Sequence, residues 1–262
     1  MLKRIEASVF ERARHFVQTR RFRQLASETQ LPEGCAVDLR TLQLLASVKA
    51  HLADDVDVLV DVGAHTGGFA APGYQVLGAR EIVCFEANTA LRSALQGKLS
   101  GIPVDLRWVA LSDRPGWLPF HVHRDPSMSS LLTSDQEVLQ REFPEDASTT
   151  IEVQVEVSTL DVQLAEAMRA GRRFFLKLDT QGNELAVLRG GVEVLKLCTG
   201  VLTEFIFTTP YQGQSSLEDL TAFMARSGFR CAAALEIRRR PSHRISAVDF
   251  LFLPSRRAGA ST

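Results

Sequence analysis

Short runs of apolar residues alternate with longer amphipathic segments from Val56 to Leu253. This alternation is typical of parallel strands joined by helices, because such strands are covered on both faces while each helix needs one apolar stripe. The runs predict strands at 58–62, 81–86, 105–111, 173–178, 200–207, 229–235 and 248–253. The amphipathic segments predict helices at 69–77, 88–99, 160–170, 184–195 and 216–227. We therefore expect an α/β fold with a parallel sheet and helical crossovers.

Two parts of the chain depart from this alternation. Residues 117–157 form a hairpin-like run, a polar loop, a short helical segment and a further strand, and within them 124–150 is a candidate lid insertion. Residues 1–52 carry two amphipathic helical patterns. We therefore divide the chain into a helical N-terminal extension at 1–52, one domain at 53–254 and a flexible tail at 255–262.

The first 25 residues are basic, with seven Lys and Arg against two Glu, although the whole chain has a net charge of -1. A basic amphipathic helix fits an anionic membrane surface, a targeting peptide, or packing on the domain with a solvated basic face, and we favour the last. A weak peripheral membrane contact through this helix stays open. The near-neutral whole chain disfavours a nucleic-acid partner.

The cysteines and the hydropathy indicate where the protein resides. Cys35, Cys84, Cys198 and Cys231 are far apart and form no C-x-x-C pair, which favours reduced thiols over a zinc site or a disulfide framework. No apolar run approaches the roughly 18 residues of a membrane span. We expect a soluble, cytoplasmic protein.

The most informative segment is V-D-V-G-A-H-T-G-G-F, where a predicted strand runs through glycines into a helix. Glycines there let the backbone approach a ligand, and the helix that follows presents free N–H groups. The G-x-x-x-G spacing of Gly63 and Gly67 differs from the G-x-G-x-x-G of dinucleotide sites, which disfavours NAD and FAD. Asp61 can accept hydrogen bonds from an ammonium group, which favours the amino-acid-bearing cofactor S-adenosylmethionine. Tight packing of the helix is the alternative role of these glycines.

Glu86 ends the next predicted strand, 25 positions after Asp61. A carboxylate at that place can accept both ribose hydroxyls of an adenosine. Either acid alone could be solvated, but two acids at the ends of consecutive strands strengthen the cofactor interpretation.

Motifs over about three quarters of the chain resemble those of the FkbM-type S-adenosylmethionine-dependent methyltransferases. They are D-V-G-A-H-T-G-G-F from Asp61, F-E-A-N from Phe85, A-L-S-D from Ala110, S-S-L from Ser129, V-S-T-L-D from Val157, K-L-D-T-Q-G-N-E from Lys177, V-L-R-G-G from Val187, and Glu204 followed by Tyr211.

The resemblance implies a class I methyltransferase (Rossmann-like) fold, with a seven-stranded, mostly parallel sheet that has one antiparallel strand near its edge. It implies methyl transfer, usually to oxygen. It also implies that Asp61, Gly63 and Gly67 hold the methionine half of the cofactor, that Glu86 holds the ribose, and that the segment with Ala110 and Leu111 lies near the adenine. The family commonly has Asn at the position of His65, so His65 either keeps that polar contact or tunes binding.

The segment K-L-D-T-Q-G-N-E suggests an active-site edge, because Lys177 and Asp179 share one face of a strand end. Asp179 is our first candidate base for an acceptor hydroxyl, and its alternatives are an ion pair with Lys177 or a helix cap. Lys177 can instead orient a substrate oxygen. Glu184, in the first helical turn, is interpreted as a capping residue. Glu204 interrupts an apolar strand and either lines the acceptor pocket or pairs with Lys177 or an arginine.

Further polar residues are weaker candidates. Ser129, Ser130 and Tyr211 are assigned to substrate binding, with a turn role open for the serines. His121 and His123 are expected on the solvent-facing side of an edge hairpin, and the run Arg238 to Arg240 in a solvated turn. No metal is assigned, since the residues identify too few ligands.

We expect methylation of a hydroxyl on a sugar or on a glycosylated or polyketide-like metabolite, an acceptor class taken from family analogy. The rivals are a nicotinamide-dependent oxidoreductase and a non-catalytic binding protein with the same fold. The acceptor, the base and the oligomeric state stay open.

Overall fold

The computed structural model describes residues 38–142, 150–208, 210–240 and 243–255. The predicted basic helix in the first 25 residues and the tail from 256 lie outside this part of the chain. The second predicted N-terminal helix is confirmed as α2 (Leu39–His51), which Asp38 caps by accepting a hydrogen bond from the backbone N–H of Arg40 at 3.2 Å.

A seven-stranded sheet forms the centre of the protein, and it has the predicted class I methyltransferase arrangement. Its strand order is β3-β2-β1-β7-β8-β10-β9, and all strands are parallel except β10, which runs antiparallel to both neighbours. The strands are β1 (Val58–Val62), β2 (Glu81–Phe85), β3 (Val104–Arg107), β7 (Phe174–Leu178), β8 (Cys198–Ile206), β9 (Phe229–Arg239) and β10 (Ile245–Pro254).

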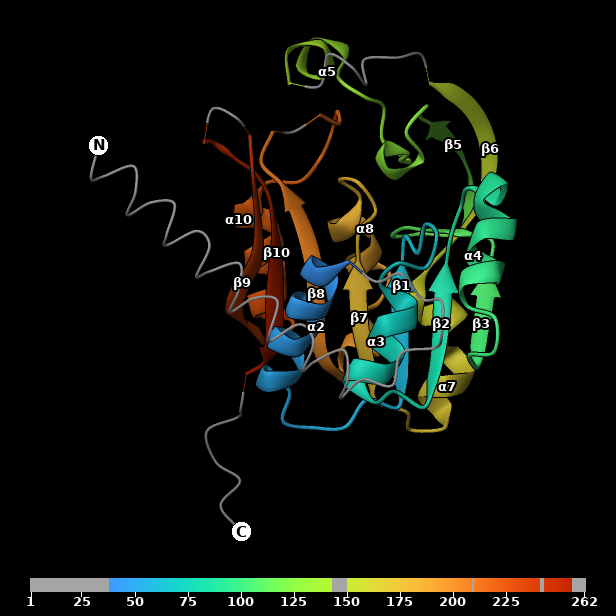
Figure 1. Ribbon diagram of the computed structural model, residues 1–262, viewed down its shortest axis with the longest axis vertical. Helices are drawn as coiled ribbons and strands as arrows, with labels where there is room; N and C mark the ends of the chain where they lie inside the picture. Colours follow the sequence, from blue (N-terminus) through green and yellow to red (C-terminus); the bar gives the residue numbers. More distant parts are fainter. Residues whose placement is uncertain (1–37, 143–149, 209, 241–242, 256–262) are drawn as a thin grey trace, which may run out of the picture.

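Helices cover both faces of this sheet (Figure 1). One layer contains α2, α3 (Ala70–Leu77) and α4 (Arg92–Lys98), with the short η1 (Thr89–Leu91) before α4. The other contains α6 (Leu160–Gln163), α7 (Ala165–Arg169), α8 (Glu184–Arg189), α9 (Val192–Leu195) and α10 (Leu217–Arg226). Alternate residues of β1 belong to the two layers, since Val58 and Val60 pack on the α8 side and Leu59 on the α3 side.

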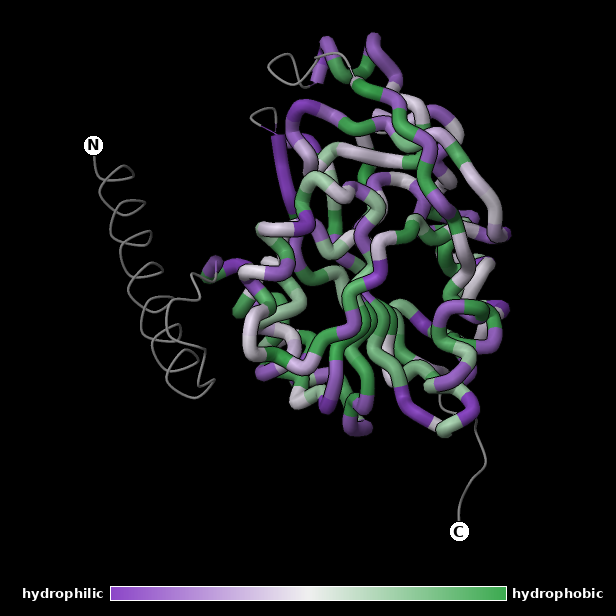
Figure 2. Tube along the Cα trace, turned by 90° about the vertical axis from the view of Figure 1, so that its right-hand side faces the viewer, coloured by the Kyte–Doolittle hydropathy of each residue, from purple (hydrophilic) through white to green (hydrophobic). Residues whose placement is uncertain are grey.

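Figure 2 shows hydrophobic residues along the central strands and hydrophilic residues around the ends of the fold. Phe85, Phe174 and Phe175 are fully buried there. Burial of each such side chain stabilises the folded state by about 1.5–3 kcal/mol. Within the described residues, no helix has both the length and the apolarity needed to cross a bilayer.

Two predicted helices are each divided into two pieces. The predicted helix at 184–195 breaks between α8 and α9 at Gly190 and Gly191. The chain packs closely at this break, where a Cβ on Gly190 would lie 2.1 Å from the carbonyl oxygen of Ser112. The predicted helix at 160–170 breaks between α6 and α7 at Leu164. A helical periodicity can continue across such breaks, which is why the sequence pattern did not reveal them.

A second sheet of three strands, in the order β4-β6-β5, stands beside the first. It contains β4 (Ala110–Leu111), β5 (Gly116–Val122) and β6 (Ile151–Ser158). The predicted single strand at 105–111 is therefore wrong, because the chain leaves the main sheet after Arg107 and β4 pairs with β6. The segment after β5 contains η2 (Pro126–Met128) and α5 (Gln136–Glu142), which lie beyond the carboxyl ends of the main strands in Figure 1.

Candidate functional site

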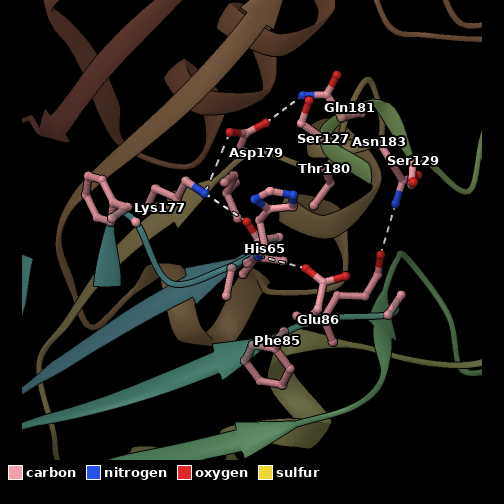
Figure 3. Close-up of a pocket in the computed structure, with 18 of the residues that line it drawn as sticks. His65, Phe85, Glu86, Ser127, Ser129, Lys177, Asp179, Thr180, Gln181 and Asn183 are labelled. Atoms are coloured by element: carbon pink, nitrogen blue, oxygen red, sulfur yellow. Dashed lines mark hydrogen bonds and ion pairs between the residues drawn. The ribbon is translucent and has the colours of Figure 1, made fainter. Parts of the chain in front are cut away.

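A cavity of about 320 Å³ opens at the carboxyl ends of β1, β2 and β7. Ligands of open parallel sheets bind at this end, where neighbouring crossovers diverge. The loop after β1, the end of β2, β4, the η2 loop and the turn after β7 line the cavity, and Figure 3 shows the polar side chains that face one another across it.

The loop after β1 fits tightly between its two neighbouring strands. The backbone N–H groups of Gly63 and Ala64 donate to the carbonyl of Phe85, at 3.0 and 3.1 Å. Gly63 has a φ of 75°, and a Cβ there would lie 2.0 Å from the carbonyl oxygen of Asp179, so only glycine fits. Gly63 lines the cavity, whereas Gly67 turns toward α4, where a Cβ would lie 3.1 Å from Leu95. The predicted roles of the two glycines are thus divided between ligand approach and helix packing.

Asp61 and Lys177 form a buried ion pair behind this loop. Asp61 is 0% exposed, and the Lys177 Nζ lies 3.0 Å from its Oδ1 and donates to the carbonyl of Gly63 at 3.0 Å. Burial alone lowers the pKa of Lys177, but the carboxylates of Asp61 and Asp179 outweigh it and raise that pKa, so the ammonium is retained. Asp61 does not line the cavity, but Lys177 does. The ammonium partner of Asp61 is therefore supplied by the protein, and Asp61 acts on the cavity through Lys177.

Glu86 and His65 face the cavity from β2 and from the loop. The two carboxylate oxygens of Glu86 accept the backbone N–H groups of His65 at 2.8 Å and Asn88 at 2.7 Å. Burial raises the pKa of Glu86, and the two N–H groups oppose that shift. His65 has a φ of 51°, and Figure 3 shows its ring between Lys177 and Asp179 on one side and Glu86 on the other. Its Nε2 is buried and hydrogen-bonds to no described residue.

The cavity wall beyond Glu86 is apolar. Ala110 and Leu111 line it as predicted, together with Phe85, Val109 and Phe120. The Asn183 side chain holds this wall in place by donating to the carbonyl of Leu111 at 2.9 Å.

These residues fit S-adenosylmethionine. The apolar wall suits adenine, and Glu86 retains lone pairs for ribose hydroxyls. The buried, unpartnered Nε2 of His65, a residue that lines the same cavity, is a polar atom for which a ligand can supply the missing partner.

A polar network extends from Asp179 away from this cavity. Gln181 stands at its centre and has a φ of 55°, a conformation that non-glycine residues rarely adopt. Its amide N–H₂ donates to Asp179 at 2.7 Å and to Glu204 at 3.0 Å, and its amide oxygen accepts from the Tyr211 hydroxyl at 2.9 Å. Ser130 donates to the carbonyl of Gln181 at 2.8 Å. Gln181 thus joins the end of β7 to β8 and to two loops.

Asp179 and Glu204 share this network, but their environments shift their pKa values in opposite directions. Burial alone raises the pKa of Asp179, but the Lys177 ammonium 3.7 Å away, the Gln181 amide and the Arg238 guanidinium outweigh it and hold that pKa below its ordinary value. Burial, reinforced by the charge of Asp179, raises the pKa of Glu204 well above its ordinary value, although Arg238 opposes the shift. Asp179 is therefore the more acidic of the two.

Arg238 pairs with Glu204, which confirms the predicted alternative of an arginine partner, and it also lies 3.6 Å from Asp249. The prediction of a solvated turn at Arg238 is wrong. β9 continues to Arg239, and its register against β10 shifts between Val248 and Phe250, where the strand is irregular. Such irregularities re-aim side chains near functional sites.

A second cavity, of about 330 Å³, adjoins the first. Both are lined by Ser127, Asp179, Gln181 and Arg238. Glu204 and Tyr211 line the second cavity and not the first. Neither Gln181 nor the inward role of Arg238 is indicated by the sequence pattern.

The remaining predicted residues divide between the cavity and its supports. Ser129 lines the first cavity, and its hydroxyl accepts the backbone N–H of His123 at 3.0 Å. Ser130 is 1% exposed and supports Gln181 rather than lining either cavity. His123 is 3% exposed, so the prediction of a solvent-facing side chain is wrong for it. Glu184 accepts the backbone N–H groups of Thr180 and Gly182, at 2.8 and 3.1 Å, which matches the capping interpretation.

The described residues contain no group of three or more His, Cys, Asp or Glu arranged to hold a metal ion.

Comparisons with known proteins give one family and several similar structures. A family model described as the methyltransferase FkbM domain matches residues 61–231. A comparison with curated proteins found no match. Among solved structures, the chain is similar to the O-methyltransferase TomG of Streptomyces achromogenes in complex with SAM, at 13% identity over 91% of this chain and 89% of that one, with a TM-score of 0.48. It is also similar to an rRNA methylase of Streptococcus thermophilus, at 10% identity over 84% of this chain and 100% of that one, with a TM-score of 0.45. A third similar structure is magnesium protoporphyrin IX methyltransferase of Synechocystis, at 10% identity over 82% of this chain and 78% of that one, with a TM-score of 0.44.

Proposed function

The protein belongs to the FkbM methyltransferase family, and from this premise we propose that it methylates a hydroxyl group on a sugar or on a glycosylated or polyketide-like metabolite. One observation carries the choice of a hydroxyl. An acidic carboxyl group, Asp179, stands in the wall that two adjoining cavities share, where it can accept a hydrogen bond from a hydroxyl.

The first cavity holds the cofactor in this proposal. Bound S-adenosylmethionine supplies an electrophilic methyl group. Glu86 accepts hydrogen bonds from the ribose, the wall with Ala110 and Leu111 contacts the adenine, and Gly63 and His65 contact the methionine half. Lys177 fixes the loop by its hydrogen bond to the carbonyl of Gly63, so the loop needs little rearrangement when the cofactor binds.

Asp179 acts on the acceptor. Its lowered pKa keeps it ionised at neutral pH, so it orients the hydroxyl and takes up the proton as that hydroxyl becomes an ether. A carboxylate with a lowered pKa is a weak base, but Glu204, linked to it through Gln181, has a raised pKa and holds a proton more readily. The two carboxylates therefore titrate as a pair, in which Asp179 meets the acceptor hydroxyl and Glu204 shares the proton that Asp179 takes up.

The nicotinamide rival is disfavoured by the same loop, because Gly63, Gly67 and Gly68 do not have the spacing that binds a pyrophosphate. A non-catalytic binding protein would need the cofactor cavity but not the ionised Asp179 beside a second cavity.

Calorimetry and turnover assays test the proposal. We expect S-adenosylmethionine and S-adenosylhomocysteine to bind and NADH not to bind, and Glu86→Ala to abolish that binding. Asp179→Asn keeps the size and the hydrogen bond to Gln181, so it should bind the cofactor as the native protein does. Methyl transfer from labelled cofactor to hydroxylated acceptors should then fall about 100-fold or more. Binding of NADH in place of S-adenosylmethionine, or full turnover by Asp179→Asn, would contradict the proposal.

A further inference from the structure

The second cavity has the composition of a binding site for one small ring. Its apolar surface comes from the end of η2, the end of β8, the segment after β8 and the start of β10, and consists of Met128, Ile206, Pro210, Tyr211 and Ala247. The volume of about 330 Å³ lies at the small end of the range for ligand sites. An apolar surface beside a few polar atoms suits the face of a ring that carries hydroxyl groups.

Two hydrogen-bonding atoms in this cavity have no partner. The Oγ1 of Thr208 and the Nε of Arg238 are buried, and neither hydrogen-bonds to any described residue. Buried polar atoms are nearly always paired in folded proteins, so two orphans in one cavity indicate a ligand or ordered water that completes them. Both atoms can donate a hydrogen bond, so a ligand group that pairs with them must carry oxygen acceptors.

The charges around the cavity argue against an anionic ligand. Arg238 already contacts Glu204 and Asp249, and Asp179 is an acidic group in the same wall. Arg240 also lines the cavity, so the two arginines of its lining are matched by two carboxyl groups, Asp179 and Glu204. The site therefore offers hydrogen-bond donors without a surplus of positive charge, and a phosphate or carboxylate would meet the repulsion of Asp179.

We propose that the second cavity is the acceptor site and that it selects neutral, hydroxyl-bearing rings against their anionic analogues. Thr208 and the Nε of Arg238 hydrogen-bond to hydroxyl oxygens on the far side of the ring, and the hydroxyl to be methylated meets Asp179 in the shared wall. This inference rests on the proposed function, and it adds the location of the acceptor and the charge that the site accepts.

Binding measurements test this without knowledge of the natural acceptor. The probes are neutral methyl hexopyranosides, each with its uronic acid and its 6-phosphate, added to the full chain saturated with S-adenosylhomocysteine and followed by saturation-transfer NMR. We expect at least one neutral glycoside to bind. Its anionic analogues should bind at least about tenfold more weakly. Thr208→Val removes one hydroxyl at nearly constant volume and should weaken neutral binding about 3- to 10-fold, the effect of one hydrogen bond.

Two further variants separate recognition from folding. Thr221→Val is the matched control, because Thr221 lies on α10 and donates only to that helix's backbone, so it should bind the glycoside as the native protein does. Arg238→Lys keeps the charge beside Glu204 but loses the Nε geometry, so it should weaken binding of the neutral glycoside more than it weakens binding of S-adenosylhomocysteine. Failure of S-adenosylhomocysteine to bind at all would refute the proposed function. With that binding intact, the acceptor assignment is overturned by an anionic analogue that binds as tightly as its neutral partner, by no glycoside binding, or by equal effects of Thr208→Val and Thr221→Val.

Discussion

Replacement of Lys177 by Met should destabilise the protein strongly, because it leaves the carboxylate of Asp61 alone in the interior. Asp61 is 0% exposed, and Lys177 is its ion-pair partner at 3.0 Å. Breaking a buried pair by removing one partner costs about 3–5 kcal/mol. Natural domains have about 5–15 kcal/mol of stability in all. Lys177→Met should therefore remove about a fifth or more of the free energy of unfolding.

The loss should depend on pH. Without the ammonium, the pKa of Asp61, which burial already raises, rises further, so the folded state holds a proton that the unfolded state has released. Stability then decreases as pH rises above the ordinary carboxyl value, by about 1.4 kcal/mol for each pH unit until the folded-state pKa is reached. We expect Lys177→Met to be less destabilised at acidic pH than at alkaline pH.

Urea unfolding at several pH values measures both effects. Asp61→Asn combined with Lys177→Met removes both charges at similar volume and should recover much of the lost stability. Lys196→Met is the matched control, because its ion pair with Glu193 is exposed and should contribute no more than about 1 kcal/mol. A loss below about 1 kcal/mol at alkaline pH, or a double variant no more stable than the single one, would refute this account of the pair.

Two shorter predictions concern the loop after β1 and the pocket wall. Gly63→Ala places a Cβ 2.0 Å from the carbonyl of Asp179 at a φ of 75°, so calorimetry should detect loss of S-adenosylmethionine binding, whereas Gly97→Ala, with no atom within 4 Å of the new Cβ, should bind normally. Burial raises the pKa of Asp249 from 3.8 to about 6, so the group favours folding below the unfolded pKa and loses that contribution as pH rises through about 6. In the native protein this loss lowers the free energy of unfolding by about 3 kcal/mol between pH 4 and 7, and Asp249→Asn should abolish it in urea unfolding curves. If the stability of the variant changed with pH as that of the native protein does, the assignment to Asp249 would be wrong.

The fold could be predicted largely because its strands are continuously apolar. β1 and β7 are buried along nearly their whole length, so their boundaries follow directly from the sequence pattern. β9 could not be bounded in this way. It is an edge strand with exposed positions, and its charged end resembles a turn in composition. The sequence pattern therefore predicts a solvated Arg238, although this residue pairs with buried Glu204.

The candidate site also contains residues that the sequence pattern identifies and residues that it does not. Glu86 and Asp179 follow strand ends, a place that sequence position alone identifies. Gln181 carries no charge and belongs to no periodic pattern, and its importance comes from contacts with Glu204 and Tyr211, which are 23 and 30 residues away along the chain. Contacts of that range depend on how the turn after β7 is folded, which neither propensity nor spacing specifies.

The position of β9 at the edge of the sheet has a consequence for protein engineering. β1, β2 and β7 are each paired on both sides, so an altered backbone in any of them disturbs two ladders, whereas β9 pairs with β10 alone. The residues proposed to hold the cofactor follow the inner strands β1 and β2 or lie on β4 of the second sheet, and Arg238 stands on β9. The edge strand can therefore be exchanged as a cassette, and libraries that vary it but keep Arg238, which lines both cavities, should change which acceptors are used while the residues that bind the methyl donor are kept.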